Sequence, residues 1–148
     1  MPRDVIQLLT ATEAALTQQT VELAEARSRQ LVSVISKAAT GTGTIDALFS
    51  LGVRYRLVVV RCHFAGASGS AAMVLSLDSV LGAAYDARLF VVTRAGTDYD
   101  INLRIPAEES QDPSPWTFQV GDQLRVQWTN PDVGNITWGL QVGLAIAS

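Results

Sequence analysis

The side chains that most often carry catalysis are scarce in this 148-residue chain, which has one cysteine, Cys62, and one histidine, His63. A cysteine–histidine pair acts as nucleophile and base only when the two side chains meet. Neighbours on a β-strand point to opposite faces, and these two residues lie in a strand-like pattern. No Gly-x-Ser-x-Gly motif accompanies the histidine. We therefore expect no catalytic residue and no enzymatic activity.

Acidic residues are the next candidates, because calcium binds several hard oxygen ligands. Asp98 and Asp100 lie two residues apart beyond a turn, so both carboxylates can face one side. The other candidates lie in the proline-containing polar stretch 106–115, which is typical of an exposed loop: Glu108, Glu109 and Asp112. The spacing of a calcium-binding loop is absent, and one cysteine with one histidine cannot supply a zinc framework. We expect neither a metal nor a cofactor.

Tryptophan side chains can stack on sugar rings when they are exposed. Trp128 and Trp138 share their strand faces with apolar residues, so we expect both to be buried. Trp116 adjoins the stretch 106–115, so we expect it to be exposed and take it as the candidate ligand contact. A carbohydrate- or receptor-binding module is therefore an alternative to a purely structural protein.

The composition is that of a folded domain with few charges, because 48% of the residues are apolar, 17% are charged and the net charge is −3. Clusters of lysine and arginine are absent, which argues against nucleic acid as a partner. No stretch approaches the roughly 20 apolar residues that span a bilayer. The N-terminus lacks the apolar core of a signal peptide. We expect assembly in the cytoplasm and no membrane partner.

Residues 1–30 form the first of two expected domains, an α-helical arm. The segment 4–29 has neither glycine nor proline and is rich in helix-forming residues. Leu9, Leu16 and Leu23 recur every seven residues, which is the spacing of a coiled-coil seam. The companion positions are mostly small or polar: Val5, Thr12, Gln19 and Ala26. The helix either packs against copies of itself or a larger partner, or lies across the second domain.

Residues 31–148 form the second expected domain, a mainly β antiparallel sandwich with about six or seven short strands. Apolar residues alternate with others, or form short runs, in the following segments: 57–64, 73–77, 89–93, 99–105, 124–128 and 136–146. This alternation assigns Val58 to the face of Val60, and Tyr99 to the face of Ile101. Residues 39–44 are expected as a turn or linker, and 95–97 as a hairpin turn.

The last expected strand, 136–146, has the most regular alternation. Every second residue from Ile136 to Ile146 is large and apolar, and small residues dominate the positions between them. Gly139 and Gly143 leave the second face almost without side-chain bulk, which lets another backbone or subunit approach closely. The other interpretation is a flat face exposed to solvent.

The order of a helix followed by these strands resembles small structural proteins of tailed bacteriophages. The resemblance rests on segments 45–48 and 54–60, on the turn and strand 118–126, and on the apolar last strand. It covers residues 31–148 and is nearest to capsid cement, or decoration, proteins; trimeric fibre or tail proteins are also similar. It implies a jelly-roll-like β-sandwich, and a homotrimer on the capsid surface of the virion that bridges neighbouring subunits of the major capsid protein. The family has no catalytic residues to transfer. The expected oligomer or partner interface is Leu9, Leu16, Leu23, Gly139 and Gly143.

Overall fold

The chain divides into two compact units in the computed structural model, Met1–Val32 and Ser33–Ser148. The structure describes residues 3–28, 33–106 and 114–147. The first unit contains α1, Arg3–Ser28, which confirms the helix predicted over residues 4–29. Within the described ranges, no helix has the length and apolar character needed to cross a membrane.

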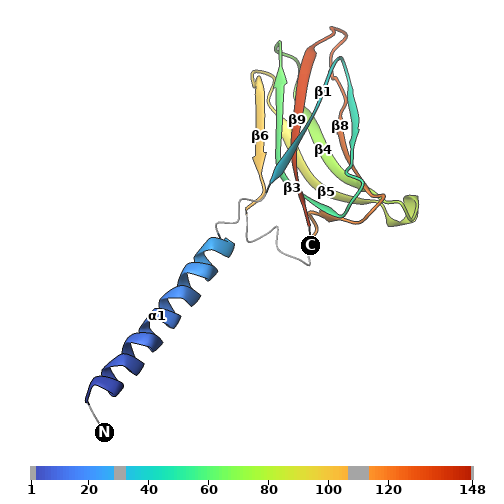
Figure 1. The fold of residues 1–148 in the computed structure, drawn as a ribbon. Helices are drawn as coiled ribbons and strands as arrows, with labels where there is room; N and C mark the ends of the chain where they lie inside the picture. The colour runs from blue at the N-terminus through green and yellow to red at the C-terminus, as the bar shows by residue number, and fades with distance from the viewer. Residues whose placement is uncertain (1–2, 29–32, 107–113, 148) are drawn as a thin grey trace. The chain divides into compact units, whose positions relative to one another are not determined.

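The second unit is mainly β and contains two antiparallel sheets (Figure 1). The β9 sheet has the order β1 (Val34–Thr42), β9 (Thr137–Ile146), β3 (Tyr55–Phe64) and β6 (Asp100–Arg104), and β7 (Thr117–Phe118) also pairs with β3. The β8 sheet has the order β2 (Ile45–Phe49), β8 (Gln123–Trp128), β4 (Ala71–Asp78) and β5 (Ala87–Arg94). A short 3-10 helix, η1 (Ala83–Tyr85), lies between β4 and β5. The predicted mainly β fold with one N-terminal helix is confirmed.

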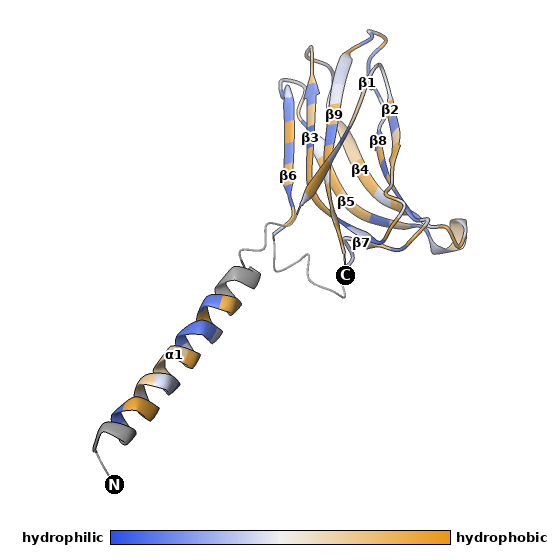
Figure 2. Ribbon diagram, in the orientation of Figure 1, coloured by the Kyte–Doolittle hydropathy of each residue, from blue (hydrophilic) through white to orange (hydrophobic). Residues whose placement is uncertain are grey.

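Both sheets contribute to one apolar core, and strands such as β6 and β8 turn alternate residues inward. Figure 2 shows this alternation clearly along β6. The rings of Phe64 from β3 and Trp128 from β8 lie 4.9 Å apart and join the two sheets. Trp128 and Trp138 are both buried, as predicted. The two sheets therefore form a β-sandwich.

The prediction of which β3 residues face the core is wrong in the first half of the strand, where the alternation assigns Val58 to the face of Val60. The pairing of β3 with β9 shifts register between Leu57 and Val59, which is a β-bulge. An extra residue reverses which residues face the core. Leu57 is therefore fully buried, whereas Val58 is only half-buried.

The predicted turn at 39–44 is mostly strand. β1 continues to Thr42, and only Gly43 and Thr44 separate it from β2. Gly43 has a φ of 75°, which glycine adopts without strain. Gly41 has a different role, because a Cβ there would lie 2.6 Å from the indole of Trp138. Close packing on a buried tryptophan, rather than a turn, accounts for that glycine.

The predicted hairpin at 95–97 is also wrong. A turn is present, with the amide of Asp98 donating to the carbonyl of Ala95 at 3.0 Å. However, β5 pairs with β4 in the β8 sheet, and β6 pairs with β3 in the β9 sheet. The turn therefore connects the two sheets.

Two residues do not lie on the strand faces predicted for them. Tyr99 precedes β6 and is exposed, and Ile146 is exposed at the end of β9.

Candidate assembly interface

Helix α1 exposes the leucines that recur every seven residues. Leu9, Leu16 and Leu23 are 60%, 58% and 63% exposed, and every described side chain in residues 7–23 is exposed. The hydroxyl of Thr12, at a companion position, donates to the carbonyl of Leu8 at 2.9 Å. That hydroxyl is satisfied within the helix, so Thr12 can enter an apolar seam without losing a hydrogen bond. The row is therefore suited to contact another helix.

The sandwich has a core built from its own strands. All the buried apolar side chains among the described residues belong to the sandwich, within residues 45–145. The rings of Tyr55 and Phe118 stack at 4.9 Å and close this core at one end. Burial of the leucines of α1 is therefore not needed to complete the core of the described sandwich.

The two glycines predicted on the outer face of β9 have different surroundings. A Cβ at Gly143 would lie 2.6 Å from a methyl group of Val59 and 2.8 Å from one of Val34, so neighbouring strands already cover this position. A Cβ at Gly139 would meet no atom within 4 Å. The register places Gly139 between Thr40 of β1 and His63 of β3. Only Gly139 leaves space for a neighbouring molecule.

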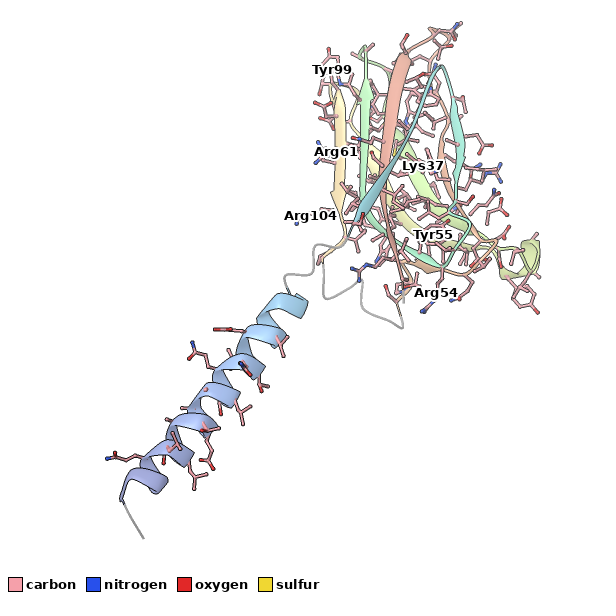
Figure 3. The ribbon with its side chains drawn as sticks, in the orientation of Figure 1. Lys37, Arg54, Tyr55, Arg61, Tyr99 and Arg104 are labelled. Carbon is pink, nitrogen blue, oxygen red and sulfur yellow. The ribbon has the colours of Figure 1, made fainter. Side chains whose placement is uncertain are left out.

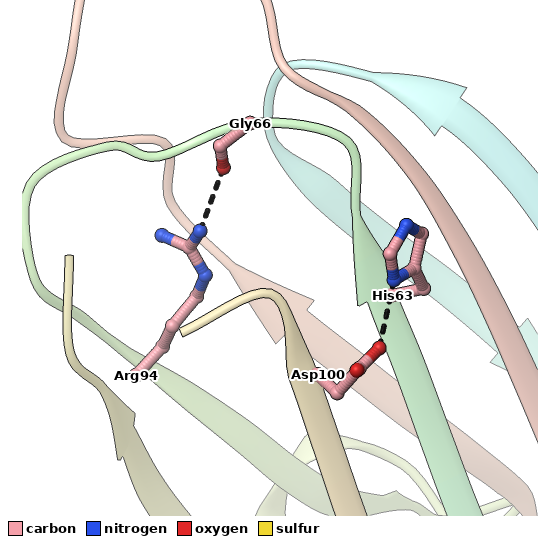
Figure 4. Close-up of polar contacts among 4 residues, drawn as sticks. All are labelled: His63, Gly66, Arg94 and Asp100. Carbon is pink, nitrogen blue, oxygen red and sulfur yellow. Dashed lines mark hydrogen bonds and ion pairs between the residues drawn. The ribbon is translucent and has the colours of Figure 1, made fainter. Parts of the chain in front are cut away.

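Polar side chains surround Gly139 on the same outer face. The Nδ1 atom of His63 lies 2.7 Å from Oδ1 of Asp100 (Figure 4). Next to them, the amide of Gln141 donates to the hydroxyl of Ser36 at 2.7 Å. Figure 3 shows Arg61 extending outward beside β6. The outer face of the β9 sheet is thus open, polar and low in side-chain bulk at its centre.

The candidate metal ligands do not converge. Asp100 contacts His63, whereas a carboxylate oxygen of Asp98 accepts the amide of Ala95 at 3.0 Å. No group of three or more histidine, cysteine, aspartate or glutamate side chains in the described ranges could hold a metal ion. Three acidic candidates lie outside the described residues: Glu108, Glu109 and Asp112.

Cys62 and His63 point to opposite sides of β3, as the strand pattern predicts. Cys62 is buried in the core, and His63 is exposed on the outer face. Burial raises the pKa of the Cys62 thiol to about 12, and nearby Arg94 only partly opposes this change. A thiol with so high a pKa is a poor nucleophile at neutral pH. The pair does not have the geometry of a catalytic dyad.

The predicted exposure of Trp116 is wrong. Its side chain is 7% exposed and lies 6.2 Å from the ring of Phe90 of the β8 sheet. Its carbonyl accepts the amide of Leu57 at 2.9 Å, and β7 then continues the pairing with β3. The chain turns into the core directly after Pro115, so proximity to prolines does not indicate exposure here. Trp116 offers no platform for a sugar ring.

Arg94 is a buried residue that the sequence pattern did not reveal. Its guanidinium lies 4.3 Å above the ring of Phe64. It donates to the carbonyl of Gly66 at 2.8 Å (Figure 4) and to the hydroxyl of Ser68 at 2.6 Å. Arg94 therefore fixes the loop between β3 and β4. The only signal in the sequence is an arginine that follows the mostly apolar run 89–93.

The loop fixed by Arg94 forms one wall of a pocket of about 350 Å³, opposite the loop between β8 and β9. The walls are mostly small residues and backbone, from residues 65–67, 132 and 134–137. The carboxylate of Asp132 accepts the amide of Gly69 at 2.6 Å, so it is already engaged. Asp132 is the one charged side chain among the described residues that line this pocket.

Comparison with known proteins adds no functional assignment. No protein-family model matches the sequence, and no curated protein matches it. The exposed face of α1 and the open position at Gly139 are therefore the features on which a functional proposal must rest.

Proposed function

We propose that this protein is a non-catalytic structural protein of a virion, of the capsid cement type, and that it self-associates through α1. Two observations support the proposal: the leucine row of α1 is exposed, and the sandwich has a core built from its own strands. Apolar residues at seven-residue spacing gain stability when helices pack against one another. These two features favour association of the chain with other chains through α1.

The order of strands supports a jelly roll. Apart from the short β7, the described part of the sandwich has eight strands in two sheets, with orders β1-β9-β3-β6 and β2-β8-β4-β5. The first four strands along the chain alternate between the two sheets, as do the last three, β6, β8 and β9. Eight strands in two such sheets are the arrangement of double-sheet jelly rolls, which occur in viral capsid proteins and in lectins. The link from this fold to a capsid is an analogy.

Cement proteins act by contact alone, and the described surfaces suit that role. A bound copy stabilises a shell because it binds the assembled state and adds buried interface. In our proposal, three copies join through Leu9, Leu16 and Leu23, and the open face at Gly139 approaches a neighbouring subunit. The proposed partners are other copies of this chain and the major capsid protein, on the capsid surface. The carbohydrate-binding alternative loses its main support, because Trp116 is buried.

The helix variants Leu16→Ala and Val21→Ala test this proposal. Both side chains are more than half exposed, so neither substitution should affect folding of the chain. Leu16 lies in the seven-residue row, and Val21 lies outside it. Size-exclusion chromatography with light scattering on the full chain should give a trimer for the unchanged protein and for Val21→Ala. Leu16→Ala should dissociate at concentrations where the control stays assembled. A monomeric unchanged protein, or equal behaviour of both variants, contradicts the proposal.

A second measurement separates the capsid from a tail or fibre location. Electron microscopy of particles carrying the labelled protein should show it over the capsid shell. Label on a tail or fibre supports the alternative of a tail or fibre protein. Absence of the protein from particles contradicts both the capsid and the tail or fibre location.

A further inference from the structure

The end of the sandwich at which β1 begins concentrates exposed apolar side chains. We propose that this end binds the same end of a second copy of the chain. This inference rests on the proposed self-association through α1 and adds a second interface to it. The residues concerned, here named the basal patch, are Val53, Val80, Leu81, Tyr85, Val120 and Ile146.

Hydrogen bonds and strand pairing place these residues at one end of the sandwich. Tyr55 starts β3 and pairs with Ile146 at the end of β9. Its hydroxyl lies 3.0 Å from the carbonyl oxygen of Phe49 and 3.1 Å from that of Asp122. The β2–β3 loop with Val53 and the turn with Val120 therefore meet at Tyr55. Figure 3 shows Arg54 and Tyr55 at this same end.

The buried carboxylate of Asp122 holds the two loops that carry Val80 and Val120 in place. Asp122 is buried, and its Oδ1 accepts the amide of Val80 at 3.1 Å. Its Oδ2 accepts the amide of Gln119 at 2.9 Å. Gly121 has a φ of 94°, and Val80 packs where a Cβ of this glycine would lie, at 2.8 Å. The turn with Val120 and the loop with Val80 are thus fixed to each other.

The rest of the β4–β5 loop is fixed in the same way. The amide of Ser79 donates to Oδ1 of Asp86 at 2.8 Å, and the amide of Leu81 donates to the hydroxyl of Ser79 at 3.2 Å. These hydrogen bonds hold the backbone of the loop and leave Leu81 71% and Tyr85 62% exposed. A loop that is held in place before binding loses less entropy when a partner covers it. Exposed apolar patches of this kind mark interaction sites.

The opposite end of the sandwich has a different surface. Among its described residues, the large apolar side chains that are exposed are Tyr99 and Val133. Glycines and polar residues of the pocket walls make up much of the remainder, including Gly66, Gly134 and Asn135. The apolar surface is therefore concentrated at the end to which α1 is connected.

The connection to α1 identifies a second copy as the occupant. Helix α1 ends at Ser28 and β1 begins at Val34, so the intervening chain spans at most about 20 Å. When helices of several copies associate, their basal patches are held close together, and tethering of this kind gives effective concentrations of about millimolar. The helix seam is short and has polar positions at Thr12 and Gln19. Added apolar contact between basal patches would extend this seam into a larger interface.

A membrane surface is the competing occupant, and the charges around the β4–β5 loop disfavour it, although Arg54 next to Val53 in the β2–β3 loop is basic. Asp78 and Asp86 flank the β4–β5 loop, and no lysine or arginine lies between them. Anionic lipid headgroups attract basic segments rather than acidic ones. Burial of the patch against another copy of a protein needs no such basic residues.

Two double variants of the full chain test the inference. Leu81→Ser with Tyr85→Ser removes the most exposed part of the basal patch. Val133→Ser with Tyr99→Ser is the matched control at the opposite end. All four side chains are exposed, so both proteins should fold. Sedimentation velocity over a dilution series should show a dissociation constant raised at least about tenfold for the basal variant. The control should remain within about twofold of the unchanged protein.

Cross-linking gives an independent measurement. Leu81→Cys and Val133→Cys are treated with a short bismaleimide, while Cys62 stays protected in the core. Leu81→Cys should give covalent multimers, and Val133→Cys should not.

The outcomes separate this inference from the proposed function. If the unchanged protein is monomeric, the proposed function fails and the basal contact between copies fails with it. If the unchanged protein assembles but the basal variant matches the control and Leu81→Cys gives no multimers, only the basal contact is overturned. A third outcome favours a membrane: the unchanged protein binds vesicles of phosphatidylcholine and phosphatidylserine, and the basal variant loses this binding but assembles normally. That result also overturns the basal contact between copies.

Discussion

The hydroxyl of Tyr55 lies 3.1 Å from the carbonyl oxygen of Asp122, and the same hydroxyl lies 3.0 Å from the carbonyl oxygen of Phe49. One side chain at the start of β3 thereby joins two loops at the basal end of the sandwich. Burial raises the pKa of the Tyr55 phenol above its ordinary value. The proton that makes these contacts is therefore retained at neutral and moderately alkaline pH.

Replacement of Tyr55 by phenylalanine tests this arrangement. The variant keeps the ring that stacks on Phe118 but removes the single hydroxyl proton that the carbonyl groups of Phe49 and Asp122 share. We expect a loss of about 1–3 kcal/mol in the free energy of unfolding. The exposed Tyr85→Phe is the control and should change it by less than about 0.5 kcal/mol. Denaturant unfolding measures both, and equal values for the two variants contradict the proposed role of the hydroxyl.

Reactivity of Cys62 provides a second prediction. Because burial raises the pKa of this thiol to about 12, little thiolate forms at pH 8, and the core also blocks reagents. Iodoacetamide should leave the native protein unmodified at pH 8 and alkylate it rapidly in concentrated guanidinium chloride. An exposed reference thiol at Ala38→Cys on β1 should react in the native protein, as mass spectrometry can show. Native Cys62 that reacts as fast as the reference contradicts the core placement.

The Asp46–Arg125 pair predicts a pH dependence. Both carboxylate oxygens of Asp46 accept from the guanidinium at 2.7 Å, and this hydrogen bonding lowers the pKa of Asp46 below 3.8. A carboxyl group whose pKa is lower in the folded than in the unfolded state stabilises the protein at pH values above its unfolded-state pKa. This stabilisation is lost as the pH falls through the folded-state pKa. The effect is small because both groups are partly exposed.

Thermal unfolding of Asp46→Asn against the unchanged protein measures this contribution. The midpoint should be slightly lower for the variant at pH 7. The difference should shrink as the pH is lowered from about 4 towards 2, where the carboxylate of the unchanged protein becomes protonated. A difference that is the same at every pH contradicts an electrostatic origin.

Strand β9 could be predicted from its regular alternation, because burial of one face imposes that period. Helix α1 could be predicted from its helix-forming residues and its lack of glycine and proline between residues 4 and 29. The bulge in β3 could not be predicted, since Leu57, Val58 and Val59 are all apolar and any of them can fill the core. The turn at 95–97 has the residues of a hairpin, and only the sheet that β6 joins shows that it connects two sheets.

The candidate interface was only partly predictable for a related reason. The leucine spacing in α1 is a property of one segment, so it is visible in the sequence. The difference between Gly139 and Gly143 depends on Val34 and Val59, which lie far away along the chain. The buried positions of Trp116 and Arg94 likewise depend on partners in other strands. Contacts between distant segments leave no local pattern from which to infer them.

The two glycines of β9 give the last prediction, as a matched pair of alanine substitutions. In Gly143→Ala, the new Cβ would lie 2.6 Å from a methyl group of Val59 and 2.8 Å from one of Val34, so these side chains or their strands must shift. We expect a loss of about 1–3 kcal/mol in the free energy of unfolding. In Gly139→Ala, the Cβ meets no atom within 4 Å. Loss of glycine flexibility in a strand should then stabilise the monomer by about 0.5–1 kcal/mol.

Assembly of Gly139→Ala decides between the two interpretations of this face. If a neighbouring subunit approaches the backbone at Gly139, the added methyl group should weaken the oligomer while the folding of each chain is unharmed. Sedimentation velocity measures the first effect and denaturant unfolding the second. An oligomer of unchanged affinity would mean that the outer face of β9 faces solvent, and that self-association depends on α1 and other surfaces. Gly143→Ala cannot make this distinction, because its effect on folding comes first.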